Sequence, residues 1–326
     1  MLIDEVARHW FDEVHVERLG VGHIHDTYLV TAHGVRYVLQ RVNQSVFTEP
    51  ELVMQQTRRV LAVWSQQTRY KVPELVASKA GLDGCWVDGQ YYRVWRYIEQ
   101  TRIVEPLEER RQAFAAGAAF GALQAQLAQL PDPRLEATIA GFLQLDHYLQ
   151  SYDEVASEAP RHLQALVDRH RDLYADLQEA NTTIHGDCKI NNLLFDEQGV
   201  AVVAIIDFDT AMFGHWAWDF GDLVRSVCFS AKRTSPEFFA ACLQGFAPHQ
   251  QRTDVASAVA APCYVTLMLG IRFLTDHLRG DAYFRVSYPG ENLQRAQEQF
   301  DLFASFRRQS KNWQNLAEEI LADLAS

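Results

Sequence analysis

Residues 182–222 read TTIHGDCKINNLLFDEQGVAVVAIIDFDTAMFGHWAWDFGD, and this stretch decides the fold. It contains two runs rich in β-forming residues, separated by a polar turn at 196–199, which predicts a β-hairpin. The sequence before it has a helical pattern over 108–130, 137–150 and 159–178, with Gly117 and Gly121 four apart to allow close helix packing. The stretch is therefore predicted to be an island of β-structure inside a helical lobe.

The N-terminal third of the chain has a different pattern. Residues 14–41 alternate apolar and polar side chains, which predicts a small antiparallel sheet. A helix with a capping-box pattern follows up to about residue 67, and residues 72–78 and 90–100 have the pattern of two more strands. The predicted fold class is α+β with two lobes. Residues 1–98 form a small lobe around the antiparallel sheet, and residues 99–326 form a mainly α-helical lobe.

Charge and cysteine content exclude several classes of protein. A net charge of −12 over 326 residues is unsuited to non-specific binding of nucleic acid or anionic lipid, which requires a basic surface. The five cysteines lack a disulfide or zinc-binding pattern, which predicts a reducing, cytoplasmic location. Residues 255–271 carry no charge, but the run is short and contains Pro262, so it is predicted to be a buried core helix. We expect neither a nucleic-acid nor a membrane partner.

Polar residues of the 182–222 stretch have the spacing of a phosphoryl-transfer site. His185, Asp187 and Asn192 follow the order H-x-D-x-x-x-x-N, in which the aspartate orients the attacking hydroxyl and the asparagine holds a magnesium ion. Asp207 ends the second β-rich run, so the hairpin is expected to return it beside Asp187 as a further metal ligand. Phosphoryl transfer depends on positioning and on cations more than on covalent chemistry. These residues supply both.

The segments HGDCKINNLLF at 185–195 and AIIDFD at 204–209 resemble the aminoglycoside phosphotransferase and choline kinase superfamily, whose fold is similar to that of protein kinases. Further segments resemble its N-acetylhexosamine 1-kinase branch: GVGHIHDTY at 20–28, YVLQRVN at 37–43, FTEPE at 47–51 and RFLTDHLRGDAYF at 272–284. The resemblance covers nearly the whole chain. It implies a two-lobed, protein-kinase-like enzyme that uses ATP and Mg²⁺ to phosphorylate a small sugar, at the anomeric hydroxyl of an N-acetylhexosamine.

The same resemblance implies a role for particular residues. Asp187 is the catalytic aspartate, Asn192 and Asp207 bind magnesium, and Lys189 contacts phosphate. The hinge at 94–99 is the adenine site, and the residues assigned to the nucleotide are Gly20, Gly22, Gln40, Arg41, Arg96, Tyr97 and Ile98. The residues assigned to the sugar are His23 and Asp26, in a loop that also holds His25, together with Arg272 and Tyr283.

The sequence differs from that of protein kinases at the residue of the third strand that contacts the nucleotide phosphates. The third strand lacks a lysine and reads Leu39-Gln40-Arg41. Strand alternation places Gln40 and Arg41 on opposite faces, and either face is compatible with the nucleotide. Glu49 and Glu51 are the only acids early in the following helix, where each is equally suited to a capping role.

Two other acids of the 182–222 stretch allow more than one interpretation. Asp219 starts the string DFG, but it opens a predicted helix, so we expect it to cap that helix or to accept hydrogen bonds from the catalytic loop. Asp209 is either an additional metal ligand or a solvated loop acid. In the C-terminal segment, Arg272 has an alternative as the ion-pair partner of Asp276, one helical turn away.

The sequence leaves two rival functions open. A choline-type or aminoglycoside-type kinase would require an acidic or aromatic acceptor pocket for a cation. A non-catalytic nucleotide-binding protein would be consistent with the missing strand lysine. The presence of Asp187, Asn192 and Asp207 counts against that second alternative.

Overall fold

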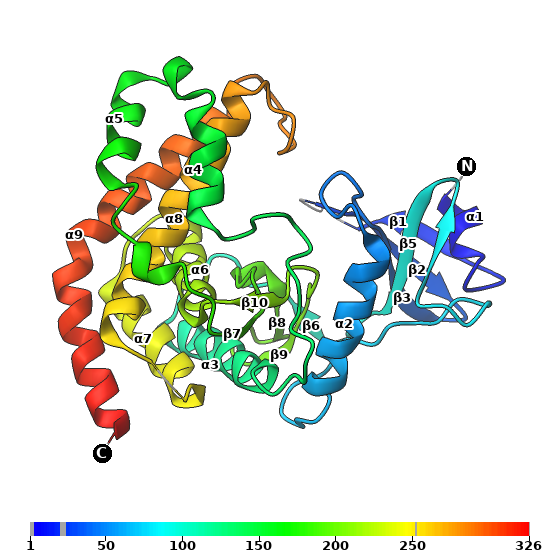
Figure 1. Ribbon diagram of the computed structural model, residues 1–326. Helices are drawn as coiled ribbons and strands as arrows, with labels where there is room; N and C mark the ends of the chain where they lie inside the picture. Colours follow the sequence, from blue (N-terminus) through cyan, green and yellow to red (C-terminus); the bar gives the residue numbers. More distant parts are fainter. Residues whose placement is uncertain (1–2, 20–23, 252, 326) are drawn as a thin grey trace.

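The computed structural model describes residues 3–19, 24–251 and 253–325. These residues form a small lobe built on a sheet and a larger helical lobe, and the chain passes from one to the other after β5 (Figure 1). Helix α1 lies on the outer side of the small lobe, and the end of α9 lies on the far side of the helical lobe (Figure 1). The structure confirms the predicted α+β, two-lobed fold class.

The small lobe is a five-stranded antiparallel sheet in the order β1-β2-β3-β5-β4. Its strands are β1 (His15–Arg18), β2 (Asp26–Ala32), β3 (Val35–Arg41), β4 (Gly84–Val87) and β5 (Gln90–Arg96). Helix α1 (Ile3–Ala7) covers one face and helix α2 (Pro50–Trp64) covers the other. Because neighbouring residues alternate faces, Leu39 and Val94 pack under α1, whereas their neighbours Gln40 and Arg93 face α2.

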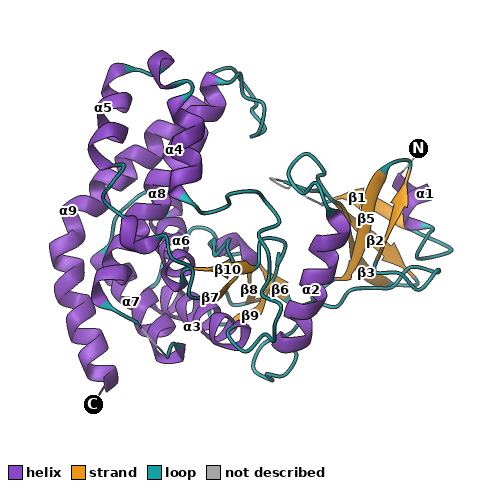
Figure 2. Cartoon of the chain, in the orientation of Figure 1, coloured by secondary structure: helices purple, strands orange, loops and turns teal. Residues whose placement is uncertain are grey.

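The helical lobe surrounds two small sheets. Its helices are α3 (Arg110–Leu127), α4 (Leu145–Asp153), α5 (Arg161–His170), α6 (Trp216–Ser230), α7 (Pro236–Phe246), α8 (Val255–Leu278) and α9 (Glu291–Ala325), with short turns η1 (Ala156–Glu158), η2 (Ala175–Leu177), η3 (Ile190–Asn192) and η4 (Ala247–His249). One sheet pairs β7 (Thr182–Ile184) with β10 (Met212–Gly214), and the other contains β6 (Thr101–Arg102), β8 (Leu193–Asp196) and β9 (Val202–Ile205) (Figure 2). All but β6 come from the predicted β-island.

Helix α8 runs through the helical lobe, packed against α6 and α9. It is long and apolar enough to cross a membrane by length and composition, but 72% of its most apolar window is buried inside the protein. Pro262 lies within it, and the Pro262 carbonyl accepts a hydrogen bond from the Thr266 hydroxyl at 2.6 Å. Helix α8 is therefore a buried core helix, as predicted.

Helices α3 and α7 cross at glycines. A Cβ atom at Gly121 would lie 2.6 Å from the carbonyl oxygen of Phe246, and Cβ atoms at Gly117 and Gly245 would clash with backbone of the facing helix. Only glycine permits so close an approach. The packing predicted from the spacing of Gly117 and Gly121 is confirmed.

Some predicted elements have different boundaries in the structure. The helix predicted over 137–150 begins only at Leu145, because the Tyr264 hydroxyl donates to the Leu143 carbonyl at 2.7 Å and accepts from the Leu145 N–H at 3.1 Å. Leu143 also has a left-handed backbone, with φ of 59°. Helix α5 covers only part of 159–178, and residues 72–78 join the sheet through an isolated bridge rather than as a strand.

The irregular segment 128–144 connects α3 to α4 and also binds the small lobe. The amide of Gln56, on α2, donates to the Glu136 carbonyl at 3.0 Å and accepts from the Glu136 N–H at 2.6 Å. Arg59 donates to the carbonyls of Pro131 and Pro133 at 2.6 and 2.5 Å. Helix α2 is thereby held between the sheet and the helical lobe (Figure 1).

Candidate active site

Asp187 lies in the loop between β7 and η3, and only one of its carboxylate oxygens is engaged. Oδ2 accepts hydrogen bonds from Lys189 Nζ at 2.5 Å and from Asn192 Nδ2 at 3.1 Å. Asn192 Nδ2 also donates to the main-chain carbonyl of Asp187 at 2.9 Å. Within the described residues, Oδ1 accepts no hydrogen bond, and the side chain is 20% exposed. One oxygen is therefore free to receive a hydrogen bond from a ligand.

The charge of Asp187 is stabilised by its neighbours. Burial would raise the pKa of Asp187, but the charge and hydrogen bond of Lys189 outweigh this effect and lower the pKa. Burial would likewise lower the pKa of Lys189, but Asp187 and Asp207 raise it. Both side chains are thus charged at neutral pH, and Asp187 can act as a hydrogen-bond acceptor.

Asp219 holds residues 185–192, the candidate catalytic loop, in place. Its Oδ2 accepts from the His185 N–H at 2.9 Å and from Gln124 Nε2 at 3.0 Å, and its Oδ1 accepts from the Gly186 N–H at 2.8 Å. The N-cap of α6 is His215 instead, whose ring accepts a hydrogen bond from the first turn. Of the two roles expected for Asp219, the structure confirms the second.

The ring of His185 links the catalytic loop to the strand that leads to Asp207. Nδ1 accepts from the Asp187 N–H at 3.2 Å, which assigns the ring proton to Nε2, and Nε2 donates to the Ile206 carbonyl at 3.2 Å. The Ile206 N–H donates in turn to the Asn192 carbonyl at 3.0 Å. The backbones that carry Asp187, Asn192 and Asp207 are thus fixed relative to one another.

Asp207 has a left-handed backbone, with φ of 69°, which is uncommon outside glycine. Its carboxylate forms no hydrogen bond with any residue in the described part of the chain. Burial and the charge of Asp209 raise its pKa. A divalent cation would relieve this repulsion, and carboxylate and amide oxygens are the ligands that magnesium prefers. Asp207 and the side-chain oxygen of Asn192 are therefore suited to hold it.

A third acid, Asp209, is enclosed just beyond Asp207. It accepts from Arg93 twice, from Nη1 to Oδ1 at 2.6 Å and from Nη2 to Oδ2 at 2.9 Å, and Oδ2 also lies 2.9 Å from His25 Nε2. Burial would raise the pKa of Asp209, but Arg93 and His25 hold it well below the usual range. At 2% exposure, Asp209 is not a solvated loop acid, which corrects one of its two sequence interpretations.

Gln40 and Arg41, the side chains expected to contact the phosphates of the nucleotide, point in opposite directions. Gln40 faces inward, where its Oε1 accepts from Arg93 Nε and Trp95 Nε1, both at 3.0 Å. Arg41 faces the opposite way and forms an exposed ion pair with Asp26. A residue expected to bind the nucleotide is thus paired with one expected to bind the sugar. The remaining candidates of this region, Gly20, Gly22 and His23, lie outside the described residues.

The hinge candidates follow the end of β5. Arg96 pairs with Glu74 at 2.9 Å, and both are exposed. The ring of Tyr97 lies 4.2 Å from the guanidinium carbon of Arg36. The carbonyl of Ile98 accepts a hydrogen bond of 2.7 Å from a threonine hydroxyl. These residues lie at the junction of the two lobes, between β5 and β6.

Arg272, near the end of α8, lies in a box of four aromatic rings. Its guanidinium carbon is 5.5 Å from the ring centroid of Phe142, 4.9 Å from Tyr148, 5.6 Å from Tyr283 and 5.3 Å from Phe284. Its one hydrogen bond, to the Tyr283 hydroxyl, is long at 3.5 Å. Within the described residues no acid pairs with Arg272, so most of its N–H donors are free.

Asp276 does not form the alternative ion pair with Arg272. Its carboxylate accepts from the N–H groups of Tyr283 at 2.7 Å and Phe284 at 2.8 Å, and from Asn292 Nδ2 at 2.9 Å. It therefore shapes the turn that supplies two rings of the box. Beside Arg272, the buried hydroxyl of Tyr148 has no hydrogen-bond partner in the described chain.

The segment 128–144 connects this aromatic box to the acidic loop. The hydroxyl of Thr138 donates to the Asp209 carbonyl at 2.6 Å, and Phe142 contacts Arg272. Four residues span at most about 14 Å of chain. The box and the loop that carries Asp207 are therefore joined through one short segment of chain, from Thr138 to Phe142.

Sequence reasoning did not single out Arg93. The available signal is an arginine in the middle of the run YYRVW, whose neighbour Val94 lies in the core. Because buried arginine requires an acid partner, this position predicts an ion pair. The partner, Asp209, lies 116 positions away and no local pattern identifies it.

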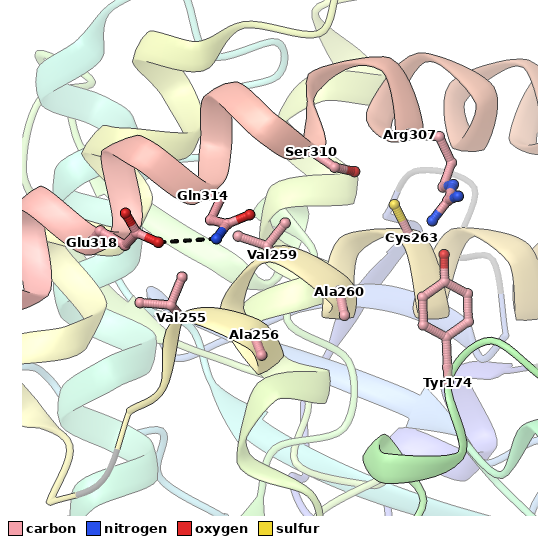
Figure 3. A pocket seen from close by; sticks show the side chains of 10 residues that line it. All are labelled: Tyr174, Val255, Ala256, Val259, Ala260, Cys263, Arg307, Ser310, Gln314 and Glu318. Atoms are coloured by element: carbon pink, nitrogen blue, oxygen red, sulfur yellow. Dashed lines mark hydrogen bonds between the residues drawn. The ribbon is translucent and has the colours of Figure 1, made fainter.

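Two cavities lie apart from these residues. One of about 350 Å³ lies between α8 and α9, with Tyr174, Cys263 and Arg307 at one end and a Gln314–Glu318 hydrogen bond of 2.9 Å at the other (Figure 3). A second, of about 520 Å³, is lined by α2 and residues 72–75. None of the catalytic, metal, nucleotide or sugar candidates lines either cavity.

A family model described as the phosphotransferase enzyme family matches residues 15–255. Solved structures of low identity share the fold. The microcompartment-associated aminopropanol kinase has a TM-score of 0.72 at 17% identity, covering 96% of this chain and 98% of that one. An amicoumacin kinase in complex with AMP-PNP and Ca²⁺ has a TM-score of 0.64 at 17% identity, covering 95% and 92%. A choline/ethanolamine kinase family protein from Mesorhizobium loti has a TM-score of 0.60 at 18% identity, covering 93% and 92%.

The family match spans most of the sheet lobe, the catalytic loop, both small sheets and the helices up to the first residue of α8. It therefore includes Asp187, Asn192 and Asp207 together with the strands that position them. The chain belongs to the phosphotransferase enzyme family.

Proposed function

We propose that this protein is a small-molecule kinase that transfers the γ-phosphate of ATP to the anomeric hydroxyl of an N-acetylhexosamine. The observation that carries the proposal is the pair formed by Asp187 and Asn192, in which one Asp187 oxygen is held and the other is free. A free, ionised oxygen fixed in this way suits a hydroxyl that must be oriented for attack on phosphorus.

In this mechanism Asp187 accepts a hydrogen bond from the sugar hydroxyl and takes its proton as the hydroxyl oxygen bonds to the γ-phosphorus. The bond from that phosphorus to the bridging oxygen breaks at the same time, and ADP leaves. Lys189, at 2.5 Å from the other Asp187 oxygen, keeps Asp187 ionised and places a positive charge beside the transferred group. Asn192 and Asp207 would hold Mg²⁺. When bound, Mg²⁺ supplies positive charge that neutralises the β- and γ-phosphates. The amicoumacin kinase bound to AMP-PNP and Ca²⁺ supports the use of ATP with a divalent ion.

The aromatic box supports a neutral acceptor over a cationic one. Aromatic faces attract cations, and choline-type acceptors are recognised in this way. Here the box already encloses the guanidinium of Arg272, so a cationic acceptor would meet a positive charge. The free donors of Arg272 instead suit the hydroxyl and acetamido oxygens of a sugar, and the Tyr283 ring offers it an apolar face.

In this proposal each lobe binds one of the two substrates. The nucleotide lies under the sheet of residues 1–98, against the hinge, and the sugar lies in the lobe of residues 99–326. The protein acts in the cytoplasm on a small molecule. A non-catalytic nucleotide-binding role is the alternative from another class, and the intact geometry of Asp187 and Asn192 argues against it.

The test is ADP release with ATP and Mg²⁺ against a panel of N-acetylglucosamine, N-acetylgalactosamine, N-acetylmuramate, choline, aminopropanol and kanamycin. Turnover on an N-acetylhexosamine is the expected result. Turnover only on choline, aminopropanol or kanamycin would overturn the acceptor. Binding of ATP without turnover on any member would favour the non-catalytic alternative.

The matched control is Asp187→Asn, which preserves the size of the side chain and removes its basicity. Loss of a positioned general base typically lowers the rate by about 10²- to 10⁴-fold. We expect a loss of this size in kcat, and the melting temperature of the variant, which also loses the charge paired with Lys189, shows that it remains folded. A variant that retains wild-type turnover would show that Asp187 does not act on the hydroxyl.

A further inference from the structure

The small lobe lacks the usual pair of a strand lysine and a helix acid. Strand β3 carries Gln40 where the lysine is expected, and Glu51 of α2 accepts a hydrogen bond of 2.9 Å from Trp86 Nε1. The α2 side chain that approaches the inner face of β5 is Met54, whose sulfur lies 3.7 Å from Arg93 Nη1. Arg93, on β5, is therefore the buried cation of the small lobe. The acid that pairs with Arg93 does not come from α2.

Every nitrogen of the Arg93 guanidinium has a partner. Nε donates to Gln40, directly opposite on β3, and Nη1 and Nη2 donate to Asp209. Arg93 is 1% exposed. Since β3 and β5 belong to the small lobe and Asp209 to the helical lobe, this ion pair crosses the junction between the lobes, in a region without water access. A buried, doubly hydrogen-bonded pair of this kind has one geometry.

A metal ion bound to Asp209 fits the structure less well than the ion pair between Asp209 and Arg93. His25, Asp207 and Asp209 have ligand atoms within 4.8 Å of one another, a spacing compatible with a metal ion. Both Asp209 oxygens, however, already accept hydrogen bonds from Arg93. The Nδ1 atom of His25 accepts from the Asn43 N–H at 3.1 Å, so its proton lies on Nε2 and points at Asp209. A protonated nitrogen has no lone pair for a metal.

We propose that Arg93 is a positioning residue: through Asp209 it joins the sheet of the small lobe to the metal-binding loop and fixes the orientation of Asp207. It thereby replaces the strand lysine and helix acid of protein kinases with a pair that spans both lobes. This inference rests on the proposed function, because it deepens the role of the same site.

The backbone supports the link from Asp209 to Asp207. Asp207 has φ of 69°, a conformation that persists only where its surroundings impose it. On one side it follows β9, and on the other it is followed by Phe208, which is 2% exposed, and by Asp209. The side chain of Asp209 is held by Arg93 and its carbonyl by Thr138. Release of Asp209 therefore frees the segment that aims Asp207.

The experiment separates this role from simple stability. Arg93→Met and Asp209→Leu each leave a buried charge without its oppositely charged partner, and both are expected to impair folding. The double variant removes both charges, and apolar replacements of a buried ion pair usually restore stability. For each protein we would measure the melting temperature and the Mg²⁺ dependence of AMP-PNP binding by calorimetry.

In the double variant we expect a melting temperature close to the wild-type value but a Mg²⁺ requirement raised by about 10- to 100-fold, the usual effect of losing a group that orients a metal ligand. AMP-PNP binding without Mg²⁺ should not change. The control is Arg171→Met with Asp153→Leu, which removes an exposed doubly bonded pair, at 3.1 and 2.7 Å, outside the site. It should leave the Mg²⁺ requirement at the wild-type value.

Each outcome decides the question. A folded double variant with wild-type Mg²⁺ dependence would overturn the role of Arg93 and leave the proposed function intact. A wild-type protein that binds no AMP-PNP with Mg²⁺ would overturn the proposed function and this inference together. Should the double variant fail to fold, Arg93→Lys keeps the charge but not the double hydrogen bond. A wild-type Mg²⁺ requirement in that variant would also overturn the inference.

Discussion

Arg93 and Arg272 both lie among protein side chains, but Arg93 is buried, Arg272 is half-buried, and their surroundings are opposite. Arg93 is paired with a carboxylate and an amide, and all of its nitrogens donate to protein atoms. Arg272 is surrounded by ring faces and makes one long hydrogen bond, to the Tyr283 hydroxyl. An arginine whose charge is cancelled can only hold other groups in place. An arginine whose charge is met only by rings retains donors for a ligand.

The largest difference between the two sites should be in stability. Arg93→Met leaves the buried Asp209 with a hydrogen bond from His25 but without its arginine, and breaking a buried pair in this way typically destabilises by about 3–5 kcal/mol. Arg272→Met replaces cation–ring contacts by sulfur–ring contacts and should destabilise by no more than about 2 kcal/mol. Urea unfolding of both variants tests this. Equal losses would remove the distinction between the two arginines.

The second difference should be in the acceptor. Arg272→Met removes the free donors that face the sugar, and hydrogen bonds from a charged group are worth enough to raise the acceptor KM by about 10- to 100-fold. The KM for ATP should not change, because the role proposed for Arg272 is in binding the acceptor. Steady-state kinetics with both substrates varied measures the two constants. A parallel rise in the ATP constant would contradict the assignment.

A smaller effect is expected at Asp276, which does not touch the acceptor. Asp276→Asn weakens the hydrogen bonds to the Tyr283 and Phe284 N–H groups, each worth about 1 kcal/mol. These two amides should exchange with deuterium faster than in the wild type, and the acceptor KM should rise by less than it does in Arg272→Met. Unchanged exchange at 283–284 would show that the turn is held by other contacts.

The smallest effect is expected at Tyr148. Its buried hydroxyl has no partner in the described chain, and removal of an unsatisfied polar group is neutral or favourable. Tyr148→Phe should therefore change the free energy of unfolding by less than about 1 kcal/mol, toward greater stability. Thermal unfolding in the absence of ligand measures it. A clear loss of stability would indicate that the hydroxyl binds a group within the protein.

The sequence predicts best what is close in the chain. Asp187 and Asn192 share one loop, and their hydrogen bond follows from a spacing of five residues. Asp219 also bonds to the catalytic loop as expected, because a short hairpin and one strand bring it back. In both cases local structure alone determines which groups meet.

The sequence predicts poorly what depends on two distant segments. The partner of Arg93 is decided by how the lobes dock, and several acids of the 182–222 stretch are equally plausible from their spacing. The start of α4 is decided by the Tyr264 hydroxyl, which binds backbone groups that a helical pattern would have assigned to the helix. Both features depend on side chains that compete for partners across the fold.

Helix α8 is synthesised before α9, the helix that covers part of its apolar surface. Its apolar surface emerges from the ribosome before α9, which covers it with buried side chains such as Phe300, packed against Gly270. Until residues 291–325 follow, the partly made lobe exposes a helix that resembles a membrane segment. A chain cut before Glu291 is therefore expected to be captured by chaperones or to aggregate, rather than to persist as a smaller kinase.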